Sequence, residues 1–261
     1  MTVAVRPGTP ADHDAYLRLF AELGVPDPPP SADAFAQRIA PTLRVACDSE
    51  DVVGYATWRA YGATAHVMQL VVRSSLRGRR IGELLLERVR GEAREAGCER
   101  WYLNVKRGNA PAIKLYTRCG FTHELDSWSM KIDRARVPPI GEPQPLLRLD
   151  EDAEAAARFG MPVERLASFR ARGNYKLVAL REGGEVVGLA AFDPGFPGAA
   201  AFCATRPELA RALLDAVRHH ADPSFDFVRV TVEGDRALAD AVVALGGAID
   251  LELVRLAAPL A

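Results

Sequence analysis

Apolar positions recur along the first half of the chain in patterns typical of strands and helices. Strands are expected at 3–6, 42–47, 51–61, 64–72 and 100–105, and helices at 10–23, 32–40, 81–96 and 110–119. Within 81–96 the apolar residues fall three or four apart, the spacing of a helix that packs one face on a sheet. Two more strands are expected between Phe121 and Ile132. The pattern predicts a mixed α/β (α+β) fold, with a mostly antiparallel sheet covered by helices on both faces.

The second half of the chain repeats this pattern. Similar pairs of segments are LRVACDSEDVVGYATW (43–58) and LVALREGGEVVGLAAF (177–192), LLERVR (85–90) and LLDAVR (213–218), and LYTRCGF (115–121) and VVALGGA (242–248). The polar, proline-rich segment 133–145 lies between the copies and suits a linker. We therefore expect two domains of one fold, 1–132 and 146–261, joined by 133–145.

Composition narrows the class of protein. The 261 residues carry a formal net charge of −1, with 49% hydrophobic and 26% charged residues, which is typical of a soluble domain and does not favour a nucleic-acid partner. No segment reaches the ~20 apolar residues of a membrane span. The N-terminus lacks the apolar region of a signal peptide, so we expect a cytoplasmic protein without membrane contact. The four scattered cysteines favour reduced thiols over disulfides or a metal site.

The segment LRGRRIG (76–82) joins a predicted strand to a predicted helix and contains three arginines and two glycines. The amides of such a turn and the positive end of a helix dipole can bind a phosphate, and glycine lets the backbone approach it closely. The alternative is a solvated arginine-rich loop with no ligand. In the second copy, ATRPELARALL (204–214) runs almost directly from strand to helix and lacks this turn.

Two motifs together resemble the GNAT N-acetyltransferase superfamily. The first, in LVVRSSLRGRRIGELLL, is similar to the Q/R-x-x-G-x-G/A signature from Arg77 to Gly82, although Arg80 stands where glycine is usual. The second, L-x-V…N-x-x-A-x-x-L-Y-x-x-x-G-F, is matched at Leu103, Val105, Asn109, Ala112, Leu115, Tyr116, Gly120 and Phe121. The resemblance covers roughly residues 1–132 and, in weaker form, 145–261.

The resemblance implies an acetyl-CoA-dependent enzyme that acetylates a primary amine of a small molecule or protein, without a metal. The implied acetyl-CoA contacts are the strand edge Leu70, Val71 and Val72, the turn residues Arg77, Gly78, Arg79, Arg80, Ile81 and Gly82, and the residues Asn104, Asn109, Ala112 and Tyr116. An amide near Leu70 would polarise the thioester carbonyl. If the turn needs a positive φ at Arg80, the arginine costs about 1 kcal/mol or more relative to glycine.

Tyr116 is the candidate catalytic residue. A tyrosine, with an ordinary pKa of about 10, can protonate the departing CoA thiolate. The alternative is a core residue, because Tyr116 shares one apolar helix face with Ala112, Leu115 and Cys119. Asn109 is expected to cap the same helix.

The base that would deprotonate the amine is not assigned by sequence. Asn104 lies where some GNAT relatives carry a glutamate, and it cannot accept the proton. His66, Glu124 or a chain of waters are candidates, and His66 also suits a structural role. The acceptor is expected near the loop 24–35 and the strand around Trp128.

The second copy has Val243 in place of Tyr116 and is therefore expected to be degenerate. It would pack against the first copy as a built-in partner, giving a monomer with pseudo-dimeric halves, unless the protein is a homodimer. The alternative function is a non-catalytic acyl-CoA-binding or regulatory protein. A dinucleotide-dependent oxidoreductase is not favoured, because no G-x-G-x-x-G follows the first strand.

Overall fold

The computed structural model of the chain describes residues 2–24, 29–137 and 141–260. These residues form two compact units. Unit 1 contains the residues up to Val105, Asn109–His123 and those from Leu256 on, whereas unit 2 contains Lys106–Gly108 and those from Glu124 to Arg255. The fold is mixed α/β in both units.

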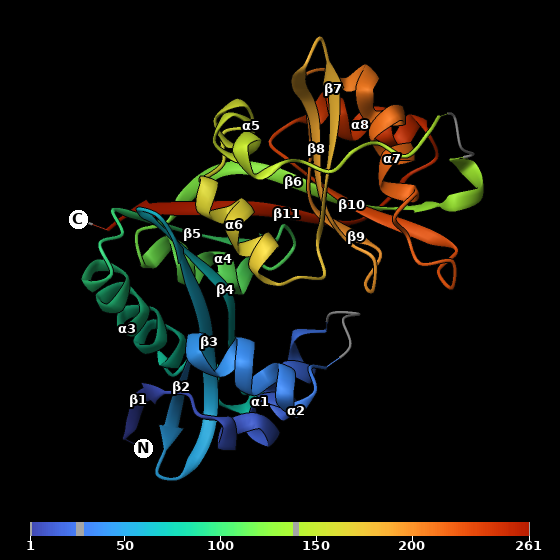
Figure 1. Cartoon of the computed structure of the whole chain (residues 1–261). Helices are drawn as coiled ribbons and strands as arrows, with labels where there is room; N and C mark the ends of the chain where they lie inside the picture. Colours follow the sequence, from blue (N-terminus) through green and yellow to red (C-terminus); the bar gives the residue numbers. More distant parts are fainter. Residues whose placement is uncertain (1, 25–28, 138–140, 261) are drawn as a thin grey trace. The chain divides into compact units, whose positions relative to one another are not determined.

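Unit 1 contains the strands and helices that the sequence predicts for its first copy (Figure 1). They are β1 (Val3–Pro7), α1 (His13–Phe20), α2 (Ala32–Ala34), β2 (Leu43–Asp48), β3 (Asp51–Tyr61), β4 (Thr64–Val72), α3 (Ile81–Glu95), β5 (Arg100–Lys106) and α4 (Ala110–Arg118). The helix expected at 32–40 is a turn of α-helix that continues as a π-helical segment, Phe35–Ile39.

The sheet of unit 1 has the order β1-β2-β3-β4-β5 and is antiparallel except for the parallel pair β4–β5. Helices cover both of its faces, as expected. On β3, Tyr55 contacts Tyr16 of α1, whereas the neighbouring Gly54 lies against Leu85 of α3. Since successive strand residues point to opposite faces, α1 and α3 lie on opposite sides of the sheet.

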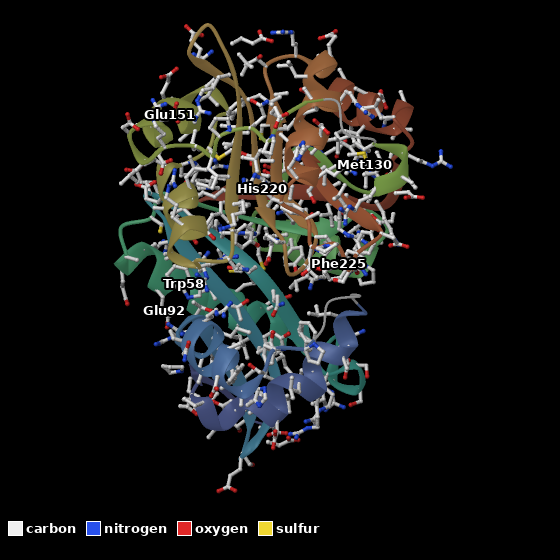
Figure 2. All side chains as sticks on the ribbon, turned by 45° about the vertical axis from the view of Figure 1, so that its right-hand side comes forward. Trp58, Glu92, Met130, Glu151, His220 and Phe225 are labelled. Atoms are coloured by element: carbon white, nitrogen blue, oxygen red, sulfur yellow. The ribbon has the colours of Figure 1, made fainter. Side chains whose placement is uncertain are left out.

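A half-buried carboxylate fixes α3 against the sheet. Glu92 accepts hydrogen bonds from Arg44 Nε (2.6 Å), from Arg88 Nε (2.7 Å) and from Trp58 Nε1 (3.1 Å) (Figure 2). Burial alone would raise the pKa of the Glu92 carboxyl, but the two arginines hold it below its ordinary value. Glu92 therefore stays charged and sets the position of α3, whose other end forms part of the candidate site.

Unit 2 repeats the order of elements. It contains β6 (Thr122–Asp133), α5 (Asp152–Arg158), α6 (Val163–Ala171), β7 (Lys176–Glu182), β8 (Glu185–Asp193), β9 (Gly198–Ala204), α7 (Ala210–Arg218), β10 (Phe227–Glu233), α8 (Arg236–Ala244) and β11 (Ala248–Pro259). Its strands follow the order β11-β6-β10-β9-β8-β7, in which β9–β10 is parallel and β6–β10, β8–β9 and β7–β8 are antiparallel. The bulge between β3 and β4 has a counterpart between β8 and β9.

Two features differ from the sequence predictions. The segment expected to form two strands between Phe121 and Ile132 is the single strand β6, because it contains no glycine or proline that could turn the chain. The compact units are also not contiguous like the expected 1–132 and 146–261. Most of β6 belongs to unit 2 and the end of β11 belongs to unit 1, where Leu260 N donates to Glu99 O (2.8 Å). Of the expected linker 133–145, residues 138–140 lie outside the described residues.

Candidate functional site

The two parallel strands of unit 1 separate along their length. Their register runs from Thr64↔Arg100 to Val67↔Leu103 and ends there, whereas β4 continues alongside β3 to Val72↔Gly54. A register shift opposite Thr57 and Trp58 leaves Met68 as a bulge in β4. The predicted contact residues Leu70, Val71 and Val72 therefore lie on an open strand edge, where backbone groups can pair with a ligand.

The arginine-rich turn is held to β4 by a hydrogen bond and to the segment after α1 by an ion pair, and sequence reasoning missed both. Arg77 donates from Nε to Val72 O (3.0 Å) and from Nη2 to Glu22 Oε2 (2.9 Å). The same Glu22 oxygen accepts from Ser74 N (2.8 Å). Arg77 thus orders the turn rather than projecting freely towards an anion. Glu22 lies far from the motif in sequence, so spacing alone gave no signal.

The remainder of the turn leads into α3 through two residues with left-handed backbone. Gly78 and Arg80 both have positive φ, +79° and +62°. The first intrahelical bond of α3 runs from Leu84 N to Arg80 O, so the amides of Ile81, Gly82 and Glu83 lie before it. Arg80 itself is 83% exposed in its side chain and lies 3.8 Å from Glu83 Oε2. The turn thus requires the left-handed conformation at Arg80.

Gly82 brings three elements together. A Cβ placed on Gly82 would lie 2.9 Å from Leu115 Cδ2 of α4 and 3.8 Å from Leu70 Cδ2 of β4. The start of α3, the middle of α4 and the open edge of β4 therefore meet at this glycine. Two of the predicted contact residues, Leu70 and Gly82, are neighbours in space although they are separated by the turn.

On α4, Asn109 is the N-cap, and its Oδ1 accepts from Ala112 N (3.2 Å) as the sequence predicts. Tyr116, on the same helix, is 7% exposed and meets the Phe121 ring edge-on at 6.0 Å. Burial, with a smaller effect of Cys119, raises the pKa of Tyr116 to about 12. The phenol is therefore protonated over the whole neutral range and can act only as a donor of its proton.

A cavity of about 610 Å³ extends along the flank of α3 from Arg80. It is lined by Arg80, Glu83, Leu86, Glu87, Arg90, Trp101, Arg118, Cys119 and Gly120. Two ion pairs cross its lining, Arg118–Glu83 (2.8 Å) and Arg90–Glu87 (2.6 Å). Arg80 is the one predicted contact residue in this cavity, and of the others only Gly120 is a motif position.

The opposite face of β4 carries a polar group among aromatic rings. Gln69 Oε1 accepts hydrogen bonds from Tyr16 OH and Tyr55 OH, both at 3.2 Å. The Tyr16 ring also contacts Phe35, 5.1 Å between centroids. Residues 25–28 of the loop expected to hold the acceptor lie outside the described residues. Alternation along β4 could not indicate this cluster, because the bulge at Met68 changes the face to which Gln69 points.

The candidate bases lie on different strands, His66 on β4 and Glu124 on β6. His66 is half-buried and stacks on Tyr102, with 4.3 Å between ring centroids. Glu124 belongs to unit 2, and Asn104 is half-buried on β5 of unit 1. The stacked position of His66 matches the structural role that the sequence left open, and no base is assigned.

In unit 2 the counterpart of the strand opening contains a charged cluster. The register of β9 with β10 covers only Gly198 and Ala199 of β9. Just beyond it, Arg165 donates to Ala200 O (3.2 Å) and to Glu233 Oε2 (2.8 Å), and Arg255 lies 2.6 Å from Glu233 Oε1. Burial would raise the pKa of Glu233, but the two arginines lower it to about 2.

Other kinds of site find little support in the described part of the chain. No group of three or more His, Cys, Asp or Glu side chains within it is placed to hold a metal ion. None of the helices in that part is long and apolar enough to cross a membrane.

Much of unit 1 matches a known protein family. Residues 13–121 match the model of the acetyltransferase (GNAT) family. A search of curated proteins gave no match. The family match runs from α1 to α4 and therefore includes the strand opening, the arginine-rich turn and Tyr116.

Solved structures resemble the chain over nearly its whole length. A GCN5-related N-acetyltransferase from Sphaerobacter thermophilus is similar with a TM-score of 0.70 and 17% identity, over 99% of this chain and 96% of that one. A Pyrococcus horikoshii protein assigned to the acetyltransferases is similar with a TM-score of 0.76 and 15% identity, over 98% of this chain and 89% of that one. A tandem GNAT protein from the clavulanic acid biosynthesis pathway is similar with a TM-score of 0.62 and 17% identity, over 100% of this chain and 99% of that one. At these identities the likeness is one of fold.

Proposed function

We propose that the chain is an acetyl-CoA-dependent N-acetyltransferase whose active site lies in unit 1, since residues 13–121 match the model of the acetyltransferase (GNAT) family. The observation that carries the proposal is the divergence of β4 from β5 after Val67, beside the amides that begin α3. An open strand edge next to a helix N-terminus suits an extended, amide-containing arm that ends in a pyrophosphate.

In this proposal the backbone amides of residues 78–83 bind the pyrophosphate of acetyl-CoA. The open space around Gly78, where an added Cβ would meet no heavy atom within 4 Å, leaves room for it. The edge at Leu70, Val71 and Val72 pairs with the pantetheine arm, and an amide near Leu70 polarises the thioester carbonyl. Arg77 supports the turn, whereas Arg79 and Arg80 add positive charge to its outer side.

The chemistry proposed for Tyr116 follows from its burial. The acceptor amine attacks the thioester carbon, the carbon–sulfur bond breaks, and the sulfur takes a proton from the Tyr116 phenol. The phenol carries that proton at neutral pH, since burial raises its pKa to about 12, further above 7 than the ordinary value of about 10. Its position beside the junction of Leu115 with Gly82 supports this role over that of a simple core residue.

The cavity along α3 suits the nucleotide end of the same molecule. Three arginines and two glutamates line it, so its lining carries a net positive charge. Arg80 belongs both to this cavity and to the turn, which would let one bound molecule reach from the turn into the cavity. Arg80, Arg90 and Arg118 would then face its phosphates.

Unit 2 is proposed to be a degenerate copy, so that the chain is a tandem protein with one acetyl-CoA site. Arg165 donates a hydrogen bond to the Ala200 carbonyl on β9, the strand that corresponds to β4. Val243, in the place of Tyr116, is 40% exposed and has no proton to give. Both features remove functions that unit 1 retains.

Calorimetric titration with acetyl-CoA, followed by a thiol-release assay across a panel of amines, tests the proposal. We expect one equivalent bound per chain, protection of residues 76–83 from hydrogen exchange, and thiol release that depends on the amine. Binding without any release would instead support the non-catalytic acyl-CoA-binding alternative. Absence of binding would reject both, and two equivalents would reject the degenerate role of unit 2.

A further inference from the structure

The bulge in β4 places the side chain of Gln69 on the face of the sheet opposite to the one that regular alternation of side chains along β4 would give it. Thr57 pairs with Gln69 and Trp58 with Val67, so Met68 is the extra residue. Trp58 hydrogen-bonds to Glu92 of α3, and Val67 shares that face, whereas Gln69 hydrogen-bonds to Tyr16 of α1. The bulge therefore turns Gln69 to the α1 face, one residue before Leu70 on the open edge.

Two buried phenols fix the carboxamide of Gln69. Tyr16 and Tyr55 are 3% and 0% exposed, and both hydroxyls donate to Gln69 Oε1. Burial, with the neighbouring Tyr16, raises the pKa of Tyr55 well above its usual value, so this hydroxyl remains a donor. With both phenols on the oxygen, the amide nitrogen is directed away from them.

The amide nitrogen is available to a ligand. Within residues 2–24, 29–137 and 141–260, Gln69 Nε2 has no hydrogen-bond partner, while Gln69 itself is only half-buried. A primary amide nitrogen offers two N–H donors and no acceptor. The group therefore recognises an oxygen with a lone pair, and it does so beside the strand edge at which the thioester carbonyl is proposed to lie.

We propose that Gln69 selects the acceptor, by donating a hydrogen bond to a neutral carbonyl or hydroxyl oxygen near the reactive amine. The substrate class is then an amine that carries such an oxygen, for example an amino-acid amide or the N-terminus of a peptide, rather than a plain alkylamine. A carboxylate is less suited, because the groups bound to Gln69 are uncharged phenols and a carboxylate is better matched by arginine. This inference rests on the proposed acetyltransferase activity.

The test compares two acceptors of similar size, alaninamide and sec-butylamine, in the wild type and in Gln69→Leu. We expect Gln69→Leu to lower kcat/KM for alaninamide roughly 10- to 100-fold, the loss from removing one partner of a buried hydrogen bond. The value for sec-butylamine and the KM for acetyl-CoA are expected to stay unchanged. Comparing each amine with itself across variants cancels the difference in amine basicity.

Three further variants separate recognition from structure. Gln69→Glu keeps an oxygen for the two phenols and replaces the N–H donors by an acceptor, so it is expected to lose alaninamide activity as well. Tyr55→Phe removes one of the bonds that orient the amide and is expected to give a smaller loss. Gln37→Leu, at an exposed glutamine of the same unit, is the matched control and should leave kcat/KM unchanged for both amines.

Each outcome decides the matter. Equal losses for both amines, or no loss for either, would overturn the selecting role of Gln69. A wild type that acetylates sec-butylamine but not alaninamide would overturn the substrate class while the acetyltransferase activity stands. A wild type that binds acetyl-CoA and releases no thiol with any amine would reject the proposed function itself, and the selecting role with it.

Discussion

At the scale of single residues, Tyr116 shows what local sequence can and cannot give. Its motif and helix were predictable, because Asn109, Pro111 and the apolar spacing define α4. Its environment was not, since burial against Phe121 and the raised pKa depend on a residue beyond the helix and on the sheet beneath it. The proposed acid role depends on the phenol, whereas the burial decides its pKa.

Replacing Tyr116 by phenylalanine removes the proton but keeps the ring against Phe121. We expect kcat to fall roughly 100-fold or more, while the affinity for acetyl-CoA is retained. In the wild type, the raised pKa keeps the phenol protonated, so Tyr116 should cause no loss of kcat up to about pH 10. Steady-state kinetics at several pH values measure both the fall of kcat in Tyr116→Phe and the pH dependence of kcat in the wild type. Tyr61→Phe, at another buried tyrosine, is the control, and an unchanged kcat in Tyr116→Phe would exclude the acid role.

Arg80 was singled out from the sequence because it replaces a glycine, and its φ of +62° shows the conformation that glycine favours. Arg80→Gly and Arg80→Ala both remove the guanidinium, but only the glycine also relieves the left-handed backbone. We therefore expect Arg80→Gly to be more stable than Arg80→Ala by about 1 kcal/mol in thermal unfolding. Equal stabilities would show that the turn does not require a positive φ. Any loss of acetyl-CoA affinity common to both variants measures the contact of the side chain with phosphate.

At the scale of elements, the two parallel strand pairs differ in what lies between them. In unit 1 the strands diverge after Val67 and leave an open edge, whereas in unit 2 Arg165 bridges β9 to Glu233 at the end of β10. The sequence indicated the loss of the turn in the second copy but gave no signal for this bridge, because Arg165 and Arg255 come from helices and strands distant in the chain. In unit 2 the bridge includes the carbonyl of Ala200 on β9, the strand that corresponds to β4.

The bridge makes unit 2 sensitive to acid. The pKa of Glu233 is about 2 in the folded chain, below its ordinary value of 4.5, so the carboxylate adds stability above about pH 4.5 that is lost as the pH falls towards 2. Glu233→Gln should be less stable at neutral pH, because two arginines then lose their counter-charge. It should also lose less stability on acidification than the wild type, as measured by urea unfolding at several pH values. An equal acid dependence in both proteins would contradict the role of Glu233.

At the scale of the whole molecule, the sequence repeat and the compact units do not share their boundaries. The end of β11 belongs to unit 1, where Leu256 and Leu260 are 4% and 5% exposed and Arg94 Nε donates to Leu260 O (2.9 Å). Residues at one end of the chain thus complete the sheet that carries the site at the other. The proline-rich segment marks a join in the sequence, but strand pairing decides which residues fold together.

Ending the chain after Arg255 removes this strand segment from unit 1 alone. The loss of three buried apolar side chains, Leu256, Ala258 and Leu260, is expected to cost a few kcal/mol and to expose the edge of β5. Hydrogen exchange of residues 99–105 should become faster, and acetyl-CoA should bind more weakly. Unchanged exchange in β5 would show that unit 1 does not depend on the C-terminal strand. Exchange in β8 of unit 2 serves as the internal reference.

The sequence by itself determined most of the strands and helices, the repeat and the motifs that resemble the GNAT family, because these depend on local periodicity, capping and spacing that a contiguous segment contains. The tertiary structure alone decided where β4 separates from β5, how the bulge orients Gln69 and that Arg77 pairs with Glu22. It also decided that the end of β11 belongs to unit 1 and most of β6 to unit 2. Those features depend on which distant segments pair and on the burial that results, and neither is recorded in the order of residues along one segment.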